Sequence, residues 1–436
     1  MSKSSFSRRK FLSTSLLTTA GLGALPHLSF GTSAAISPVR DSSKVRLGFI
    51  GLGRQAVGLL GNFMNNPDVE VTAAADVYEI KLERFKLRTG KLYEARGQKS
   101  DEIQLYADYK ELLKSDKVDA VVISSPDHWH ALMAIDACRA GKDIYLEKPL
   151  TFTVKEGQEL VKAVRANGIV LGVGNMQRGG ANFQHAVRMV QKGYLGKIST
   201  VYASVGANPF PKEIDYETQP IPAGLDWKTW NGPIPTVPFF SDLNPPISLN
   251  PDVNEKAWGA WRWYKKTGGG LMTDWGAHMF DIAQWGIGMD RNGPVEVIVD
   301  KGEEPMKYRY ANGIEMIVSP FDGSTRQGVK FIGEKGWITV GRGDYNTSVK
   351  DAEMKFTQEQ LGFSAHHVDF IDSVLMRKDP ITPVEVGHST CTVCTIGNIA
   401  HELGRSLKWD PIAQVFIGDE EANSYLHYNY ENGLSL

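Results

Sequence analysis

Short apolar runs alternate with longer amphipathic stretches through the first part of the chain. The strand-like runs lie at 45–50, 69–75, 120–124 and 144–146. The stretches with helical spacing of apolar residues lie at 80–89, 109–113 and 131–140. Repeated strand–helix units of this kind predict a doubly wound parallel sheet, which we place at residues 45–165.

The pattern changes in the remaining residues, 166–436. Residues 209–251 hold ten of the 21 prolines, so this segment is expected to be extended and held by packing. Five short runs then alternate apolar and polar residues between glycine turns, at 295–299, 306–310, 314–319, 328–332 and 337–340. Together with helices expected at 182–192, 364–376 and 387–403, they predict an α+β domain with a large, open, mostly antiparallel sheet. We expect this domain to bind substrate and its open sheet to pair copies of the chain.

Composition narrows the classes of function. The 48 basic residues nearly balance 50 acidic ones, for a net charge of −2, so no nucleic acid or anionic membrane surface is expected as a partner. The three cysteines make no disulfide framework. Cys391 and Cys394, three residues apart on an expected helix, are interpreted as packed side chains rather than half of a zinc or redox site.

The N-terminus has the features of an export signal. Arg8 and Arg9 precede Phe11 and Leu12, and an apolar run of small residues follows before a Ser-Ala-Ala sequence at 33–35. This pattern predicts a twin-arginine (Tat) signal over residues 1–35 and a periplasmic destination, with the Tat export machinery as a partner. A Sec signal and a basic tail are the alternatives. Because the twin-arginine route carries folded proteins, it suits a chain that must bind a cofactor before export.

The first strand runs into a glycine turn that is typical of dinucleotide binding. Gly51 and Gly53, followed by Arg54, Gln55 and an alanine, fit the spacing G-x-G-x-x-A of a Rossmann domain. The glycines let the backbone approach a pyrophosphate, and the helix N-terminus favours its charge. The motif alone is weak.

The second strand ends in Asp76, twenty residues beyond the motif, where a carboxylate can hold a ribose diol. A carboxylate there repels a 2′-phosphate, which favours NAD over NADP. Arg54 could still stack on an adenine or bind a phosphate.

Polar side chains also follow the later strands. Ser125, Pro126, His128 and His130 form a loop after one strand, Glu147 and Lys148 end the next, and Gln177 follows a strand at 169–173. Because ligands of open α/β sheets bind at the carboxyl ends of the strands, we expect these residues at the cofactor site. A loop histidine is as often an ordinary hydrogen-bonding residue, and a lone lysine is commonly a solvated charge.

A glycine run at 268–270 leads into an expected helix that carries ionisable residues. Asp274, His278 and Asp281 are spaced i, i+4, i+7 and would share one helical face, with Thr273 as the cap. An acid and an imidazole one turn apart suit general acid–base catalysis, with the carboxylate fixing the tautomer. A metal pair is possible by the same spacing, but no third ligand is evident. A salt pair on the helix surface is the structural alternative.

Tryptophans gather in the same region, with seven of the ten between Trp227 and Trp285. Their flat faces can stack on a sugar, although buried packing or a subunit interface explains such residues equally well.

These motifs together resemble the Gfo/Idh/MocA oxidoreductases, the group of glucose–fructose oxidoreductase and inositol dehydrogenase. The matching pieces are Gly51-Leu-Gly53, Ser125-Pro126-Asp127-His128-Trp129-His130, Glu147-Lys148-Pro149, Gly268-Gly-Gly with Asp274-x-x-x-His278, and Asn398-Ile-Ala-His-Glu-Leu-Gly404. They span nearly the whole chain after the signal. The resemblance implies a catalytic trio of Lys148, Asp274 and His278, with His278 as base and Lys148 beside the nicotinamide steadying the developing alkoxide. The implied cofactor-binding residues are Gly51, Gly53, Arg54, Gln55, Asp76, Ser125, Pro126, His130, Glu147, Lys148 and Gln177.

The expected function is that of an exported oxidoreductase that moves a hydride between a tightly bound NAD or NADP and a sugar or polyol carbinol. Because the periplasm lacks a nicotinamide pool, the cofactor should be recycled within the site. The alternative is an NAD-dependent glycoside hydrolase or lyase that acts through a transient keto sugar. A sugar-binding protein without turnover is a third possibility, which the intact trio disfavours. No resident metal is expected.

Overall fold

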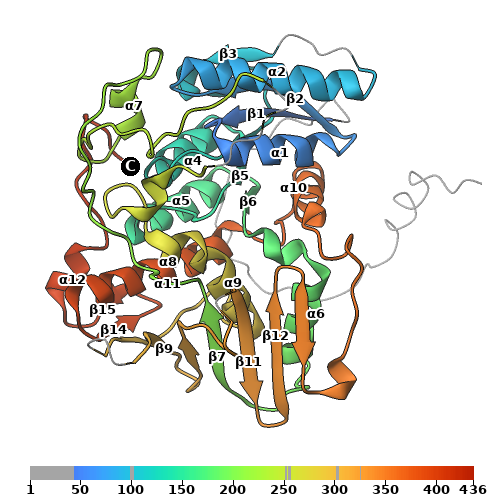
Figure 1. Cartoon of the computed structure of the whole chain (residues 1–436), viewed down its shortest axis with the longest axis vertical. Helices are drawn as coiled ribbons and strands as arrows, with labels where there is room; N and C mark the ends of the chain where they lie inside the picture. Colours follow the sequence, from blue (N-terminus) through green and yellow to red (C-terminus); the bar gives the residue numbers. More distant parts are fainter. Residues whose placement is uncertain (1–43, 99–102, 251–252, 254–256, 301–303, 325) are drawn as a thin grey trace, which may run out of the picture. The chain divides into compact units, whose positions relative to one another are not determined.

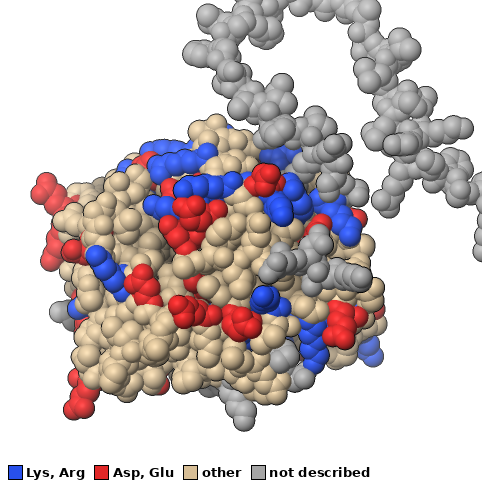
Figure 2. Space-filling model, turned by 90° about the horizontal axis from the view of Figure 1, so that it is seen from above, with Lys and Arg blue, Asp and Glu red and all other residues tan. Residues whose placement is uncertain are grey.

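The computed structural model describes residues 44–98, 103–250, 253, 257–300, 304–324 and 326–436. The signal predicted at 1–35 lies outside these residues. Among the helices that are described, none combines the length and apolar character needed to cross a bilayer. Figure 2 shows basic and acidic side chains interspersed on the face seen there, with wide uncharged areas between them.

A parallel sheet of six strands, within the described residues, forms the first domain (Figure 1). The strand order is β3-β2-β1-β4-β5-β6. The strands are β1 (Val45–Ile50), β2 (Val69–Ala75), β3 (Gln104–Tyr106), β4 (Ala120–Ile123), β5 (Asp143–Leu146) and β6 (Leu171–Val173). Every residue of β4, β5 and β6 is buried, as expected of parallel strands covered on both faces. The predicted doubly wound sheet is therefore confirmed.

The first domain extends beyond the boundary that we predicted at residue 165. β6 pairs in parallel with β5, with Leu171 beside Ile144, and so belongs to the first sheet. The boundary is wrong by one strand, because three apolar residues carry too little pattern to show which sheet they join.

Helices cover both faces of this sheet and create two apolar cores. Those from the first domain are α1 (Arg54–Met64), α2 (Glu79–Ala95), α3 (Tyr109–Leu113), α4 (His130–Arg139) and α5 (Val154–Ala166). A further helix, α10 (Ser364–Met376), comes from the C-terminal half of the chain and packs against α1, where its Phe370 lies beside Phe63. The second half of the chain thus completes the core of the first domain.

The second sheet has nine described strands in the order β13-β12-β11-β7-β10-β9-β8-β14-β15. They are β7 (Ile198–Ser204), β8 (Glu296–Ile298), β9 (Lys307–Arg309), β10 (Glu315–Ile317), β11 (Gly328–Gly333), β12 (Gly336–Gly341), β13 (Asp344–Thr347), β14 (Leu407–Asp410) and β15 (Val415–Phe416). Only β7 and β10 pair in parallel among these, so the sheet is mixed and mostly antiparallel, as predicted.

Helices α6 (Ala181–Gln191), α9 (Gly276–Gly286) and α11 (Val384–Leu403) pack against the second sheet (Figure 1). They share a large apolar core with it, which includes Phe280, Tyr308 and Phe331. Cys391 and Cys394 are buried on α11, as the packed interpretation predicted. The chain then ends beyond a short helix, α12 (Glu420–Ser424).

The proline-rich residues and those that follow them to Tyr264, together called the proline-rich segment from here on, build a small core around α7 (Trp227–Asn231) and a 3-10 turn (Ala260–Trp263). The buried members of this core are Leu225, Trp227, Trp230, Ile234, Val237, Phe239, Phe240, Leu243, Trp261 and Tyr264. Backbone hydrogen bonds join it to the residues that follow β2: the amide of Glu79 donates to Gly224, and that of Asp226 to Val77. The segment therefore lies across the edge at which the strands of the first sheet end.

Candidate active site

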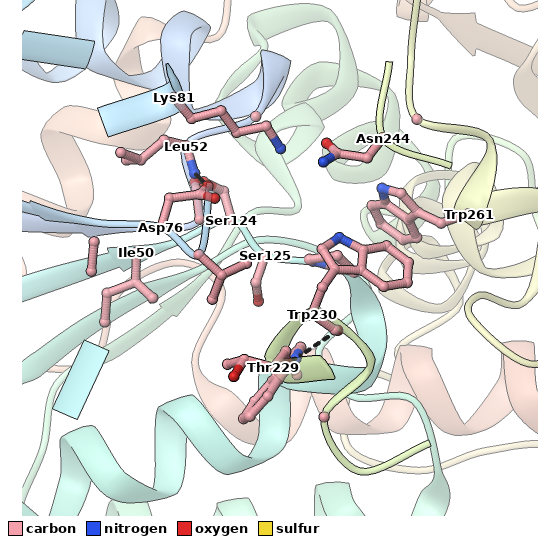
Figure 3. Close-up of a pocket in the computed structure, with 18 of the residues that line it drawn as sticks. Ile50, Leu52, Asp76, Lys81, Ser124, Ser125, Thr229, Trp230, Asn244 and Trp261 are labelled. Carbon is pink, nitrogen blue, oxygen red and sulfur yellow. Dashed lines mark hydrogen bonds between the residues drawn. The ribbon is translucent and has the colours of Figure 1, made fainter. Parts of the chain in front are cut away.

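A cavity of about 550 Å³ lies at the carboxyl ends of β1, β2 and β4. Open α/β sheets bind their ligands at this edge. The predicted cofactor residues that line the cavity are Gly51, Gly53, Arg54, Gln55, Asp76, Ser125 and Pro126. The opposite wall comes from the proline-rich segment, with Trp230, Asn244 and Trp261 facing Asp76 and Ser125 across the space (Figure 3).

The two glycines of the turn have different tasks. Gly51 has a φ of +79°, and a Cβ there would lie 2.6 Å from the backbone nitrogen of Ser125. Gly53 precedes α1 with ordinary backbone angles, and a Cβ there would meet no atom within 4 Å. Gly51 is thus required by the close approach of β1 and β4. Gly53 keeps open the space before the helix N-terminus, where a pyrophosphate is stabilised.

Asp76 is fixed at the cavity wall by backbone donors. The amide of Leu52 donates to its Oδ2 at 2.7 Å, and the amide of Tyr78 donates to Oδ1 at 3.0 Å. Lys81 extends into the same part of the cavity (Figure 3). The acceptor that the sequence predicted for a ribose diol therefore has a defined position.

Two buried polar groups of the cavity have no hydrogen-bond partner among the described residues. They are Oγ of Ser125 and Nδ2 of Asn244. Buried polar atoms are normally satisfied by protein, water or ligand, so these two are available to a polar ligand. With the glycine turn, the N-terminus of α1 and Asp76, the donor and acceptor set fits a dinucleotide.

The cavity is covered by segments of the same chain. Nε1 of Trp129 donates to the carbonyl of Trp230 at 3.0 Å, which ties the proline-rich segment to the loop after β4. The guanidinium of Arg54 lies 4.3 Å from the ring centre of Trp258, which belongs to that segment. Asn432, near the C-terminus, also lines the cavity. A ligand held here would be enclosed without a second chain.

Lys148 points into the structure from the end of β5 and is not a solvated charge. Its Nζ donates to Oδ1 of Asp274 at 2.5 Å and to the carbonyl of Asp274 at 3.0 Å. Arg262 lies on the other side of this carboxylate, with 3.8 Å between its Nε and Oδ1. Burial tends to raise the pKa of Asp274, but Lys148 and Arg262 outweigh it and lower the pKa, so the group is a carboxylate.

His278 lies in the first turn of α9 and is 4% exposed. The amide of Gln177, with its oxygen toward Arg342, donates to Nδ1 of His278 at 2.6 Å. Nη2 of Arg342 lies 3.3 Å from Nε2 of the same ring. Burial, with the nearby charges of Lys148 and Arg342, holds the pKa of His278 well below its usual range. The imidazole is therefore neutral and can accept a proton.

The continuous helix predicted for this region is wrong. The chain forms α8 (Gly270–Asp274) and then α9, with a break at Trp275, and Thr273 lies inside α8 and not at its cap. In the structure Asp274 contacts Lys148, and it is Gln177 that contacts Nδ1 of His278. A helical spacing of four residues predicts a shared face only while the helix is unbroken.

Asp281 likewise does not join the acid–base pair. It is fully buried and receives two hydrogen bonds from Arg178, at 2.7 and 2.8 Å. Asp290 binds the same guanidinium from a more exposed position. This ion pair fastens α9 to the 3-10 turn Met176–Gly179, which carries Gln177.

Of the other predicted cofactor residues, Glu147 adjoins the cavity and His130 does not line it. Glu147 is buried beside the glycine turn and accepts from Nε2 of Gln55 at 2.7 Å, which places it next to the cavity. Both ring nitrogens of His130 face backbone carbonyls, those of Pro149 and Ser125, and the ring is not part of the cavity wall. His130 therefore holds together the two loops that carry Ser125 and Lys148.

The sequence interpretation missed three side chains of the site: Asn244, Arg262 and Arg342. Asn244 and Arg262 come from the proline-rich segment and its end, whose path has no periodic pattern to predict it. Arg342 lies in a Gly-Arg-Gly turn just after the strand predicted at 337–340. A charged residue between glycines in a tight hairpin was the available signal.

Acidification is expected to destabilise the fold. Burial lowers the pKa of His128, His130 and His367 to about 4 and that of His366 to about 3. The unfolded chain binds these protons near pH 6.5, so the free energy of unfolding falls as the pH drops from 6.5 to 4. Each ring contributes up to about 1.4 kcal/mol per pH unit.

Acids whose pKa burial raises oppose this effect, and the largest shifts with a value are those of Asp127 and Glu156. Burial raises the pKa of Asp127 to about 8 and that of Glu156 to about 7, so the folded chain holds their protons over the same interval. Because eight histidines have lowered pKa values and five acids have raised ones, the urea concentration at the midpoint of unfolding should decrease as the pH is lowered from 6.5 to 4.5. An unchanged or higher midpoint at pH 4.5 would show that the rings are not buried as described.

Two family models match the chain. The model of the Gfo/Idh/MocA oxidoreductase family with an NAD-binding Rossmann fold matches residues 45–175. The model of the C-terminal alpha/beta domain of this oxidoreductase family matches residues 209–433.

Among curated relatives, an alpha-N-acetylgalactosaminidase of Shewanella oneidensis is 29% identical over 208 residues, 44% of each chain. A glycosyl hydrolase family 109 protein of Solibacter usitatus is 34% identical over 166 residues, 37% of this chain and 36% of that protein. The alignments thus span less than half the length of these relatives.

Solved structures show the same fold at low identity. The WlbA dehydrogenase from Chromobacterium violaceum, in complex with NADH and UDP-GlcNAcA, has a TM-score of 0.60 and 18% identity, over 86% of this chain and 99% of that one. The aldose-aldose oxidoreductase from Caulobacter crescentus, complexed with glycerol, has a TM-score of 0.58 and 19% identity, over 84% and 99%. Because the C-terminal family model alone covers more than half of the chain, the protein belongs to the Gfo/Idh/MocA oxidoreductase family.

Proposed function

We propose that the protein moves a hydride between a sugar or polyol carbinol carbon and a nicotinamide cofactor that stays bound between turnovers. One observation carries this proposal: Lys148 pairs with Asp274 near a neutral His278, and Arg262, which contacts Asp274, connects this group to the wall of the cavity. A bound nicotinamide supplies the hydride acceptor or donor. The residues of the chain then have to manage the charge and proton of the substrate oxygen.

Each of the three residues has a role that follows from its contacts. A hydroxyl must lose its proton as hydride leaves its carbon, and neutral His278 accepts that proton. The ammonium of Lys148 stabilises the negative charge that develops on the oxygen. Asp274 fixes the ammonium through two hydrogen bonds and balances its charge while the site is empty of substrate. On reversal, the same groups return the proton to the oxygen.

Tight binding of the cofactor is proposed from the cover over the cavity. The roof consists of the proline-rich segment and residues near the C-terminus, so release requires their displacement. A cofactor that stays bound suits a chain exported in folded form. We keep export to the periplasm by the twin-arginine route as a proposal. Asp76 at the ribose end favours NAD over NADP, since its carboxylate repels a 2′-phosphate.

We also propose that copies of the chain pair through the second sheet. On β7 and β11, Val201 and Phe331 face the core, while Tyr202 and Ile332 are partly exposed on the opposite face. An open sheet face with such side chains is suited to a partner of the same kind.

An NAD-dependent glycosidase is the second candidate. It is favoured by curated relatives named as an alpha-N-acetylgalactosaminidase and as glycosyl hydrolase family 109 proteins. Oxidation of one sugar carbon acidifies a neighbouring C–H, which permits elimination of the aglycone. Water then adds to the double bond that elimination leaves, and the hydride returns to the keto carbon. The same Lys148 and His278 would serve this cycle.

Both candidates are tested on the protein as purified. Denaturation should release close to one nucleotide per chain, identified by mass as NAD(H). Sugars and glycosides are then followed by NMR: a keto sugar identifies the oxidoreductase, and free aglycone identifies the glycosidase. A protein that retains no nucleotide and converts no sugar would contradict both.

A further inference from the structure

Arg342 reaches the active site from the second sheet. It lies in a two-residue turn between β12 and β13, where Gly341 pairs with Asp344 and Gly343 has a φ of +75°. The buried Nδ2 of Asn182 donates to the carbonyls of Gly341 and Asp344, at 2.8 and 3.0 Å. Asn182 therefore fixes the backbone of the turn, and the fold sets the position of Arg342.

The guanidinium is placed by neutral groups alone. It donates to the amide oxygen of Gln177 at 3.0 and 3.1 Å and lies 3.3 Å from His278. The rings of Trp275 and Phe363 lie 4.5 and 5.4 Å from it. Among the described residues, no carboxylate forms an ion pair with Arg342. Part of the residue is exposed to solvent, although burial near Trp275 and Phe363 lowers the pKa of the guanidinium.

The surrounding charges leave an excess of positive charge. Three cations, Lys148, Arg262 and Arg342, lie around Asp274, which is the acid that pairs with the first two. Burial raises the pKa of Glu147, and it raises that of Asp127 to about 8, so Asp127 is neutral near pH 7. A guanidinium beside the base, with no carboxylate in direct contact, is suited to an anion carried by a ligand.

We propose that Arg342 binds an oxyanion carried by the substrate, so that the preferred substrates are sugar acids or sugar phosphates rather than neutral sugars. This inference rests on the proposed function, since it places the sugar beside His278. Arginine presents parallel N–H donors that match both carboxylate and phosphate. The contact would also orient the sugar, because Arg342 and the base His278 lie side by side.

The test compares sugars that differ at one group. Glucose, glucuronate and glucose 6-phosphate form one set, and the galactose and mannose counterparts form two more. Binding to the purified holoprotein is measured by calorimetry at low and high salt, together with KM where turnover occurs. In at least one set, the acid or phosphate should bind about 10- to 100-fold more tightly than the neutral sugar. Salt should reduce the difference.

Variants assign the effect to Arg342. R342Q should abolish the preference, while R342K should retain more of it for the phosphate than for the carboxylate, because lysine acts as a point charge. Arg326→Gln, an exposed arginine just before β11, is the matched control and should change nothing. Melting temperature and nucleotide content show that each variant is folded.

The outcomes separate this inference from the proposed function. Neutral sugars that react as well as their acids and phosphates would overturn the role of Arg342 while upholding hydride transfer. Oxyanion binding that R342Q removes, without any redox reaction, would support Arg342 and overturn the proposed function. A preference that survives R342Q, or no preference in any set, contradicts the inference.

Discussion

Lys148→Met should slow reduction of the bound nucleotide about 100- to 10,000-fold while leaving the nucleotide in place. Methionine keeps the length and apolar stem of lysine but removes the ammonium. The substrate oxygen then develops its charge without the ammonium to stabilise it, and Asp274 loses the cation that donates to it directly. The rate is measured as the absorbance change at 340 nm when sugar is mixed with the purified protein.

The control for this variant is Lys162→Met. Lys162 lies on α5 and pairs with Glu159, and its side chain is 68% exposed. This change should leave the rate and the nucleotide content as they are. A Lys148→Met protein that reacts at the normal rate would remove Lys148 from the chemistry. Loss of the nucleotide itself would mean that Lys148 serves cofactor binding instead.

Gly53→Val should give a folded protein that is purified without nucleotide. The backbone angles at Gly53 suit any residue, and a Cβ would meet no protein atom within 4 Å, so the fold has no reason to reject the side chain. The added methyl groups would instead fill the space before α1 that a pyrophosphate needs. We expect at least a 100-fold loss of affinity, measured by the nucleotide released on denaturation and by titration with NAD.

Gly58→Val is the matched control for this change. Gly58 lies one turn further along α1, is exposed, and likewise has no atom within 4 Å of an added Cβ. The same substitution there should leave the nucleotide content unchanged. If Gly53→Val retains the nucleotide as well as the control does, the glycine turn is not where the pyrophosphate binds.

The parts of the site that the sequence predicted are those tied to strand ends. Gly51, Asp76, Ser125 and Lys148 each follow a short buried run, and parallel strands bring such positions to one edge of a sheet. That rule needs no knowledge of the rest of the fold. It explains why these residues surround or adjoin one cavity in the structure.

The parts that the sequence did not predict depend on packing between distant segments. Asp274 and His278 belong to two helices with a break at Trp275 between them, although their spacing fits one helix. The two partners of His278 are distant in the sequence. Gln177, in a 3-10 turn, precedes it by 101 residues, and Arg342, in the β12–β13 hairpin, follows it by 64. No local pattern brings such segments together, because their meeting depends on how two sheets and α9 pack.

The proline-rich segment shows the same limit. Its composition predicted an extended path held by packing, and its apolar residues follow no helical or strand period. Its aromatic residues do pack into a core, and Trp230 and Trp261 belong to both this core and the cavity wall. From the sequence, packing in a core and contact with a ligand were alternative roles for these tryptophans. In the structure, each of the two packs in the core and also lines the cavity.

The central claim is that hydride passes directly between a sugar carbon and the bound nicotinamide beside Lys148 and His278. The most direct measurement uses sugars deuterated at every carbon. The purified protein is incubated with these sugars and then denatured, and the mass of the released nucleotide is measured by mass spectrometry. We predict that the reduced nucleotide gains one deuterium, and that Lys148→Met suppresses this gain. A nucleotide that remains free of deuterium while the sugar is converted would contradict the account.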